Sequence, residues 1–159
     1  MLTQSAEKTL SKLLYIGPAL VTLIVFTQGV TDPVNVTKLF ILGGLAFGLI
    51  AGISLKSVRA LWSVHKFVVS SISIFLFASL NSLMQSDAPF SQSLYGVYGR
   101  NNGFILYVFL ILCFISVMTI SSRSSFENLV KSMVVAGVIN LIYCLWVILF
   151  GDFVGWNNP

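Results

Sequence analysis

The stretch "GFILYVFLILCFISVMTISS", residues 103–122, decides the fold class of this chain. It lies within a run of 22 uncharged residues between Arg100 and Arg123. A helix needs about 20 mostly apolar residues to cross the hydrocarbon core of a bilayer. Because lipid offers no hydrogen-bond partners to a backbone, a crossing segment must satisfy its peptide groups internally, as a helix does. The stretch therefore predicts a transmembrane helix.

Four other uncharged runs have a similar length. They hold 19, 17, 20 and 20 residues, and they lie between Lys12 and Asp32, Lys38 and Lys56, Lys66 and Asp87, and Lys131 and Asp152. The runs lack the alternating hydrophobicity of a membrane β-barrel. They predict an all-α, polytopic membrane bundle of about five helices. This single membrane domain covers 1–159, with spans at about 13–30, 38–55, 67–86, 103–122 and 132–150.

The composition agrees with a membrane protein. Of the 159 residues, 57% are hydrophobic and only 9% are charged, whereas soluble domains carry about 25% charged residues. The net charge of +4 does not indicate nucleic acid as a partner, because basic residues commonly anchor the cytoplasmic side of a membrane protein. The lipid bilayer is the partner that the composition predicts.

The first run has an alternative interpretation as a cleaved signal peptide, with Lys8 and Lys12 as its basic region. Its apolar stretch is near the upper length limit for such a peptide, and no small-x-small cleavage site follows. A retained helix is therefore favoured. Pro18 lies near its cytoplasmic end, where an early helical turn or a kink is tolerated.

Basic residues are distributed unevenly over the predicted connections. Seven of the nine fall on one side of the predicted membrane: Lys8, Lys12, Lys56, Arg59, Lys66, Arg123 and Lys131. Only Lys38 and Arg100 fall on the other side. Since cytoplasmic loops are enriched in Lys and Arg, the N-terminus is predicted to be cytoplasmic and the C-terminus extracytoplasmic. The connection 87–103 then faces outward.

Small and polar residues predict how the helices pack. Three glycines in the second span repeat at every fourth position: Gly44, Gly48 and Gly52. Small residues at this spacing let a neighbouring helix approach closely, so contact between helices is expected, with self-dimerisation as the less favoured alternative. Asn81 and Asn140 are expected to face other helices, because exposing an amide to lipid is costly.

Two further features concern the chain outside its spans. The stretch 56–66 predicts a short interfacial helix with Trp62 at headgroup depth. His65 is the one histidine, and no group of residues has the spacing of metal ligands. The sequence therefore predicts no metal site.

The outward segment "LYGVYGRNNGF", residues 94–104, places Arg100 among three glycines. One interpretation is a lipid anchor whose guanidinium reaches lipid phosphate. The other is anion capture, because arginine binds phosphate through two parallel hydrogen bonds and stays charged. The glycines permit tight turns that bring backbone N–H groups close to a ligand. Tyr95 and Tyr98 would form an interfacial platform beside this site.

Three segments carry a resemblance to a known family: "TDPVNVTKLFILGG" (31–44), "LYGVYGRNNGF" (94–104) and "GDFVGWNNP" (151–159). In this order they resemble the N-terminal part of the bacterial O-antigen ligase and O-antigen polymerase family of membrane glycosyltransferases. The first is similar to a D-P-x-N-x-x-K-x-x-x-L pattern before the second span. The second resembles an outward Gly-Arg-Asn-x-Gly segment, and the third resembles an aromatic-Asn-Pro segment after the fifth span.

The resemblance implies a multi-pass protein of the bacterial inner membrane. It would transfer glycan from an undecaprenyl diphosphate carrier, at the outer face, to a lipid A core sugar, another glycan or a protein side chain. Such enzymes need no nucleotide sugar, metal or other cofactor. The residues implied in binding the carrier phosphates are Gly99, Arg100, Asn101, Gly103 and Lys38.

The sequence also departs from the family. Its members have more spans and a large outward loop that supplies the arginine and histidine of catalysis, and this sequence has no outward histidine. No catalytic residue is therefore assigned, and the chain is expected to be part of a longer protein and inactive alone. One alternative is a complete five-helix protein that assembles with other membrane subunits. A transporter fragment is disfavoured, because the uncharged runs that form the spans carry no Asp, Glu, Lys or Arg between their bounding charges.

Overall fold

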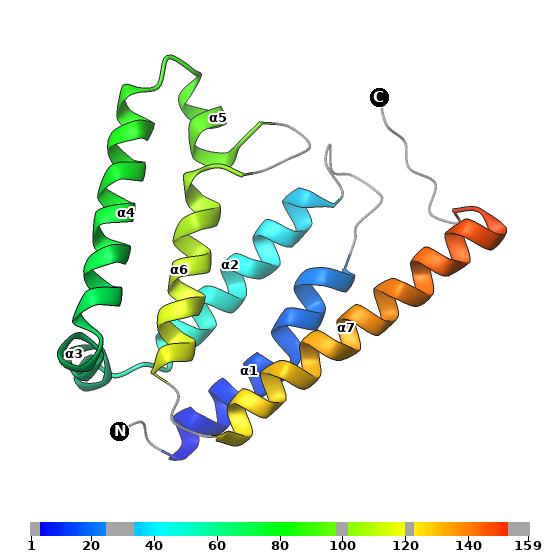
Figure 1. The fold of residues 1–159 in the computed structure, drawn as a ribbon, viewed down its shortest axis with the longest axis horizontal. Coiled ribbons are helices and arrows are strands. Elements are labelled where there is room, and N and C mark those ends of the chain that lie inside the picture. Colours follow the sequence, from blue (N-terminus) through cyan, green and yellow to red (C-terminus); the bar gives the residue numbers. More distant parts are fainter. Residues whose placement is uncertain (1–3, 25–33, 98–101, 120–122, 153–159) are drawn as a thin grey trace.

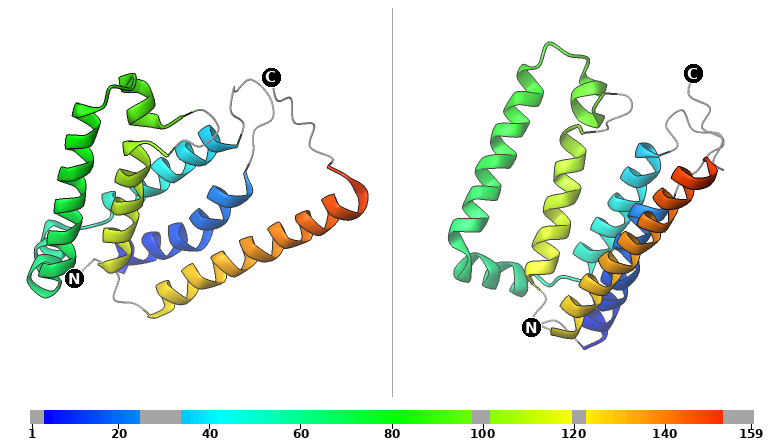
Figure 2. Two further views of the ribbon diagram at one scale, coloured as in Figure 1. Left: turned by 45° about the horizontal axis from the view of Figure 1, so that its top comes forward. Right: turned by 45° about the vertical axis from the view of Figure 1, so that its right-hand side comes forward.

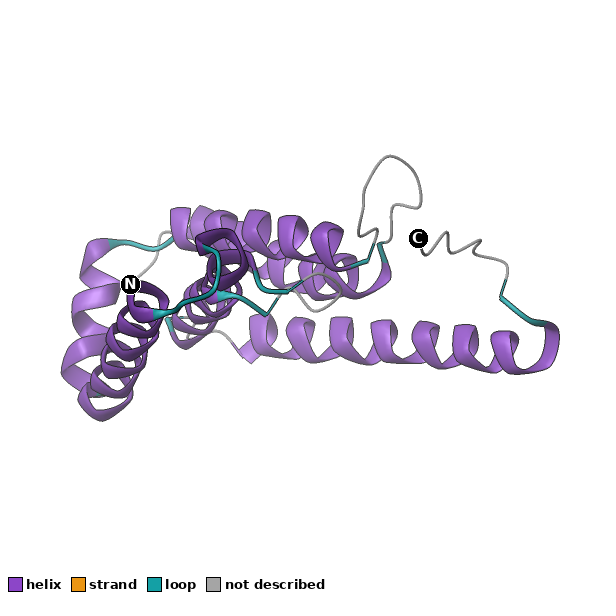
Figure 3. Cartoon of the chain, turned by 90° about the horizontal axis from the view of Figure 1, so that it is seen from above, coloured by secondary structure: helices purple, strands orange, loops and turns teal. Residues whose placement is uncertain are grey.

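The computed structural model describes residues 4–24, 34–97, 102–119 and 123–152. Figure 3 shows helices and connecting loops, with no strand in these ranges. The helices are α1 (Gln4–Leu23), α2 (Asn35–Ala51), α3 (Leu55–Val64), α4 (Lys66–Gln85), α5 (Phe90–Tyr95), α6 (Phe104–Met118) and α7 (Arg123–Phe150). The predicted all-α fold is confirmed.

Helix length and hydropathy decide which elements can cross a membrane. Among the described residues, α4 and α7 are long and apolar enough by themselves. A third crossing is added if α2 and α3, which meet at a bend of 96°, are counted as one broken span. α6 is strongly apolar but has only 15 residues. Two or three helices of the described chain therefore qualify as membrane-crossing.

The long helices overlap the five uncharged runs but differ from them at their ends. α1 begins at Gln4 rather than near residue 13, and α7 begins at Arg123 rather than near residue 132. Both extensions are polar turns that pack on each other, and Asn128 Nδ2 donates a hydrogen bond to Ser11 Oγ at 2.9 Å. Charge spacing alone missed these turns, because a helix can continue past its lipid-facing residues.

Successive long helices run in alternating directions (Figure 1). The start of α1, the whole of α3, the end of α6 and the start of α7 lie at one end of the molecule. The start of α2, the α4–α5 turn and the start of α6 lie toward the other. Helices that alternate in this way place odd and even connections at opposite ends.

The core lies where α1 packs against α2 and α7 (Figure 2). Leu10, Leu14 and Leu49 are buried there. α7 presents a face of small residues to this contact: Ser125, Ser132 and Ala136 are its buried residues. Small side chains at spacings of seven and four residues let α1 approach α7 closely.

Pro18 lies inside α1 without ending the helix. Thr22 Oγ1 donates to the carbonyl oxygens of Pro18 at 2.9 Å and Ala19 at 3.1 Å. These bonds run back to carbonyls of the preceding turn, a common pattern for threonine in a helix. The carbonyl that the proline ring leaves without an N–H donor is that of Leu14, four residues earlier, and Thr22 does not bond to it. Because α1 begins at Gln4 rather than near residue 13, Pro18 lies in the second half of the helix and not in its first turn, where it was predicted.

α4 is different, because none of its side chains is buried. It contacts α5 and α6 at one end and α3 at the other. The best-defined contact with α6 is between the rings of Phe75 and Tyr107, whose centroids lie 5.7 Å apart at 71°. α4 therefore forms one wall of a space that it shares with α5 and α6.

The helix predicted over 56–66 is confirmed as α3. Ser54 begins it, because its Oγ accepts a hydrogen bond from the backbone N–H of Ser57 at 3.2 Å. Such a cap satisfies one of the free N–H groups of the first turn. The position of α3 at a membrane surface stays a prediction.

Candidate functional site

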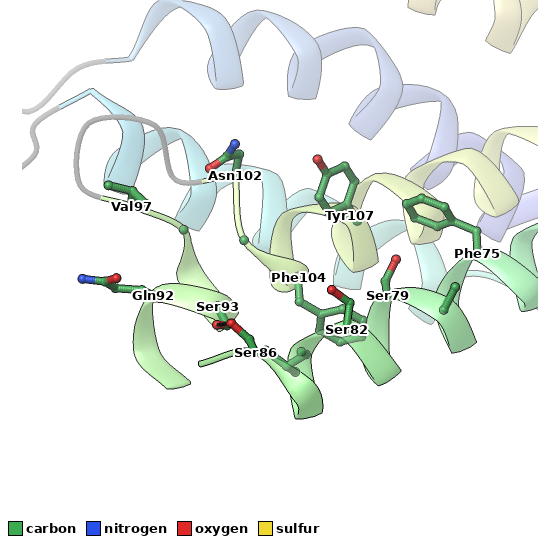
Figure 4. Close-up of a pocket in the computed structure, with 14 residues that line it drawn as sticks. Phe75, Ser79, Ser82, Ser86, Gln92, Ser93, Val97, Asn102, Phe104 and Tyr107 are labelled. Atoms are coloured by element: carbon green, nitrogen blue, oxygen red, sulfur yellow. Dashed lines mark hydrogen bonds between the residues drawn. The ribbon is translucent and has the colours of Figure 1, made fainter. Parts of the chain in front are cut away.

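A polar pocket of about 500 Å³ lies between α4, α5 and the start of α6 (Figure 4). Its polar lining consists of Ser79, Ser82, Ser86, Gln92, Ser93 and Asn102. Phe75, Phe104 and Tyr107 form much of its apolar wall. The volume lies within the range of about 300–1,000 Å³ that is usual for small-molecule sites.

The periodicity of α4 places its serines on one face. Ser79, Ser82 and Ser86 are separated by three and four residues, so they line the same side of the helix end. In Figure 4 the hydroxyl groups of Ser79 and Ser82 point from α4 toward α6. Neither hydroxyl has a hydrogen-bond partner within the described ranges of the chain. Both can therefore bind a ligand without breaking an existing hydrogen bond.

Ser86 holds the turn between α4 and α5. Its Oγ accepts hydrogen bonds from the backbone N–H of Ala88 at 3.2 Å and from Ser93 Oγ at 3.1 Å. These two hydrogen bonds hold α5 against the end of α4, although both bonds are exposed to solvent. The rim of the pocket is thus built by a local polar network rather than by a hydrophobic core.

Two glycines fix the ends of the segment that follows α5. Gly96 has φ of +96°, a conformation that favours glycine, and its N–H donates to the Gln92 carbonyl at 2.8 Å. At Gly103 an added Cβ would meet the backbone of Leu94, Tyr95 and Gly96. The chain therefore returns to within backbone contact of the end of α5 before α6 begins. Both ends of the Arg100 segment lie at the pocket.

The predicted phosphate-binding residues are only partly placed. Gly99, Arg100 and Asn101, and the predicted interfacial Tyr98, lie outside the described residues. Gly103 lies at the pocket, where it is buried. Lys38 is half-buried in the first turns of α2 and does not line the polar pocket. The structure does not bring Lys38 and Gly103 together in that pocket.

Tyr95 lines a second, apolar groove of about 630 Å³ on the other side of α6. α2 contributes Val36, Leu39, Phe40, Gly43, Gly44 and Phe47 to it, and α6 contributes Ile105 and Phe109. The rings of Phe47 and Phe109 close its inner part at a centroid distance of 5.7 Å. Tyr95, half exposed at the rim, is therefore part of an apolar groove rather than of the polar pocket.

The predicted packing glycines of α2 have different surroundings. A Cβ at Gly48 would lie 3.3 Å from Leu13, and one at Gly52 would lie 3.1 Å from Leu10, so both glycines face α1. Gly44 has no neighbour within 4 Å of such a Cβ. Gly43, which the spacing rule passed over, faces α6, because its Cβ would lie 2.8 Å from the ring of Phe109.

The two asparagines were expected to face other helices and to bond to them, and among the described residues their hydrogen bonds stay within their own helices. Asn140 does face other helices, because it lines a cavity between α7, α1, α2 and α6. Asn81 is exposed, and its Oδ1 accepts from Gln85 Nε2 at 2.9 Å within α4. Asn140 Nδ2 donates to the Ala136 carbonyl of its own helix at 2.9 Å. Each side chain thus satisfies part of its hydrogen bonding locally, which the rule for buried amides did not anticipate.

The sequence did not lead us to predict the polar pocket residues on α4 and α5. The serines at 79, 82 and 86 gave the available signal, a repeat of one residue type on a single helical face. All the pocket side chains are neutral hydrogen-bonding groups or apolar. They can bind hydroxyl groups or phosphate oxygens, but they offer no general acid or base. Within the described residues no three His, Cys, Asp or Glu side chains group as metal ligands.

Comparison with protein-family models, with curated proteins and with solved structures finds no match to this chain.

Proposed function

We propose that this chain is the N-terminal membrane portion of a glycosyltransferase of the O-antigen ligase or polymerase type. The polar pocket carries the proposal, because both fixed ends of the Gly-Arg segment meet the hydroxyl groups of Ser79 and Ser82 there, which have no hydrogen-bond partner among the described residues. The ligand of this pocket is a glycan linked to undecaprenyl diphosphate. Transfer itself also needs an acid or a base, which the described lining of the pocket does not supply.

The proposed topology has five crossings, made by α1, α2, α4, α6 and α7, in the bacterial inner membrane. The N-terminus is cytoplasmic, and the pocket opens at the outer face. The alternating directions of these helices support this arrangement. The clustering of basic residues in the connections at one end supports the orientation.

The chemistry divides between two sets of groups. Ser79 and Ser82 bind oxygens of the ligand, either sugar hydroxyls or phosphate. Arg100, two residues before Asn102 in the sequence, neutralises the diphosphate. The first turn of α6 adds partial positive charge at the same place, because peptide dipoles at a helix N-terminus favour an anion. A leaving diphosphate is stabilised by the same contacts.

The direct test is binding of a short-chain prenyl diphosphate to the purified chain in detergent, with the matching prenyl alcohol as comparison. The diphosphate is expected to bind more tightly. Arg100→Ala is expected to weaken diphosphate binding roughly tenfold or more, because hydrogen bonds to charged groups are worth about 1.5–3 kcal/mol. Ser79→Ala with Ser82→Ala is expected to cause a smaller loss. Equal affinities for the alcohol and the diphosphate would contradict a phosphate-binding site in this pocket.

Two controls locate the effect. Arg100→Lys keeps the charge and loses the planar fork, so its affinity is expected to lie between those of the wild type and Arg100→Ala. Lys38→Ala removes the other outward cation. Because Lys38 lies away from the polar pocket, this variant is expected to keep the diphosphate affinity of the wild type. In the longer protein, Arg100→Ala is expected to lower glycan transfer more than Arg100→Lys. Wild-type transfer by both variants would return Arg100 to the role of a lipid anchor.

A further inference from the structure

α3 is the most strongly amphipathic of the described helices of ten or more residues. Val58 and Trp62 lie four residues apart on one side, and they remain 43% and 51% exposed. Lys56 and Arg59 lie on a different side, and both are exposed. Exposed apolar and basic faces on one short helix are typical of a segment that lies in a membrane interface.

The rest of the described chain leaves both faces uncovered. α3 packs mainly on α4, and among the described side chains of α3, Leu61 is the large apolar one that is buried. Lys56, Arg59 and the following Lys66 make no ion pair, since the ion pair found among the described residues joins Arg123 and Glu127 on α7. Three neighbouring positive charges therefore lack a counter-charge within this part of the molecule.

The placement of α3 fits a surface rather than a crossing. It meets α2 at 96°, so it runs across the direction of that long helix. Figures 1 and 2 place it at the same end of the molecule as the start of α1 and the start of α7. Lys8 and Lys12 of α1 also lie near that end. A bilayer crossed by the long helices would have its surface at α3.

We propose that α3 binds the headgroup layer of a bilayer that contains anionic phospholipid. Val58 and Trp62 insert between the headgroups, while Lys56, Arg59 and Lys66 contact lipid phosphates. Charge complementarity selects this occupant, because each Lys or Arg near a surface of anionic lipid contributes about 1 kcal/mol, or roughly a fivefold enrichment. The inference stands independently of the proposed glycan transfer.

The experiment measures how closely lipids of each kind approach Trp62. The variant Trp146→Phe/Trp156→Phe leaves Trp62 as the one tryptophan. It is reconstituted in phosphatidylcholine vesicles that contain the same small fraction of either brominated phosphatidylglycerol or brominated phosphatidylcholine. Bromine quenches tryptophan fluorescence on contact. The phosphatidylglycerol is expected to quench Trp62 several-fold more, because it is enriched around α3.

Two charge variants in this background complete the test. Lys56→Gln/Arg59→Gln is expected to remove most of the excess quenching by phosphatidylglycerol, with the remainder due to Lys66. Lys8→Gln/Lys12→Gln removes the same charge from α1 and is expected to keep most of it. Absence of quenching by either lipid would show that Trp62 is covered by protein, and equal quenching in the wild type would show no charge preference. Either result would overturn the proposal.

A second measurement does not depend on the tryptophan variants. The wild-type chain is extracted from vesicles of phosphatidylcholine and phosphatidylglycerol. Native mass spectrometry then identifies and counts the lipids that stay bound to the protein. Retained phosphatidylglycerol is expected to exceed retained phosphatidylcholine several-fold, and Lys56→Gln/Arg59→Gln is expected to reduce this excess more than Lys8→Gln/Lys12→Gln does. Equal retention of both lipids by the wild type would count against the proposal even if the single-tryptophan variant failed to fold.

Discussion

α7 and α4 carry the same spacing of small residues and have different surroundings. On α7 the residues are Ser125, Ser132 and Ala136, and on α4 they are Ser71, Ala78 and Ser82. The α7 set is buried against α1, whereas the α4 set is exposed. The difference teaches that small residues permit close approach of a helix but do not supply the partner.

The partner of α7 explains its packing. α1 brings Leu10 and Leu14 into a core with Leu49 of α2, and Leu129 of α7 packs against that core. α4 meets no comparable row of large side chains, and Phe67, Phe77 and Met84 are among its most exposed residues. In the proposed membrane these residues would face lipid, which is as apolar as a leucine side chain. Burial by protein is therefore unnecessary for α4 there.

The largest effect is expected at Gly103, where two backbone segments of the α4–α5–α6 region approach most closely. Gly103→Ala would drive a methyl group into the backbone of Leu94 to Gly96, which cannot move aside as a side chain can. We expect a loss of about 3 kcal/mol in unfolding free energy, at the upper end of overpacking costs. Thermal unfolding in detergent measures it. Gly44→Ala, which meets nothing within 4 Å, serves as the control.

A Gly103→Ala chain as stable as the wild type would show that the return of the chain to α5 is not fixed. The contrast between α7 and α4 would then be larger, because the contact of the Gly103 backbone with α5 would not be tightly packed either. Binding of prenyl diphosphate should fall with stability if the glycine also shapes the pocket.

A matched pair of substitutions tests the two helices directly. Ala136→Leu adds bulk at the buried α1–α7 contact and is expected to lower the unfolding free energy by about 2 kcal/mol. Ala78→Leu adds the same bulk to exposed α4 and is expected to leave stability unchanged. Chemical or thermal unfolding of both variants in one detergent gives the difference. A similar loss in Ala78→Leu would mean that α4 is covered in solution, and the contrast with α7 would be broken.

The sequence predicted the helices better than their contacts. Charge-free runs identify apolar helices because lipid or a core excludes charge, so the main helices overlap all five runs. α1 and α7 begin before the predicted spans 13–30 and 132–150, because the polar turns there are held by packing, including the Asn128–Ser11 bond. Such contacts join residues 117 positions apart and leave no local pattern.

The candidate site was predicted in part. The glycines of the outward segment suggested tight turns, and the positive φ of Gly96 and the backbone contact of Gly103 give two of them a physical reason. The serine wall on α4 was missed, since serine also occurs in apolar helices bonded to its own backbone. Ser71 does this, donating to the Phe67 carbonyl at 2.9 Å, and only the structure separates it from Ser79 and Ser82.

The smallest effect concerns hydrogen bonds between and within helices. Asn128 donates to Ser11 across α7 and α1, whereas Ser73 on α4 donates to the Val69 carbonyl of its own helix at 2.9 Å. Interhelical bonds in membrane proteins average about 0.6 kcal/mol, so Asn128→Leu is expected to cost about that much. Ser73→Ala is expected to cost nothing, because the carbonyl keeps its helical donor.

A double-mutant cycle of Asn128→Leu with Ser11→Ala isolates the shared bond from other effects of each change. We expect a coupling of about 0.6 kcal/mol in the unfolding free energy. Additive losses would show that each side chain acts through other neighbours. The first turns of α1 and α7 would then be held together by side-chain packing, including that of Leu129 on Leu10 and Leu14, and the difference between α7 and α4 would rest on that packing.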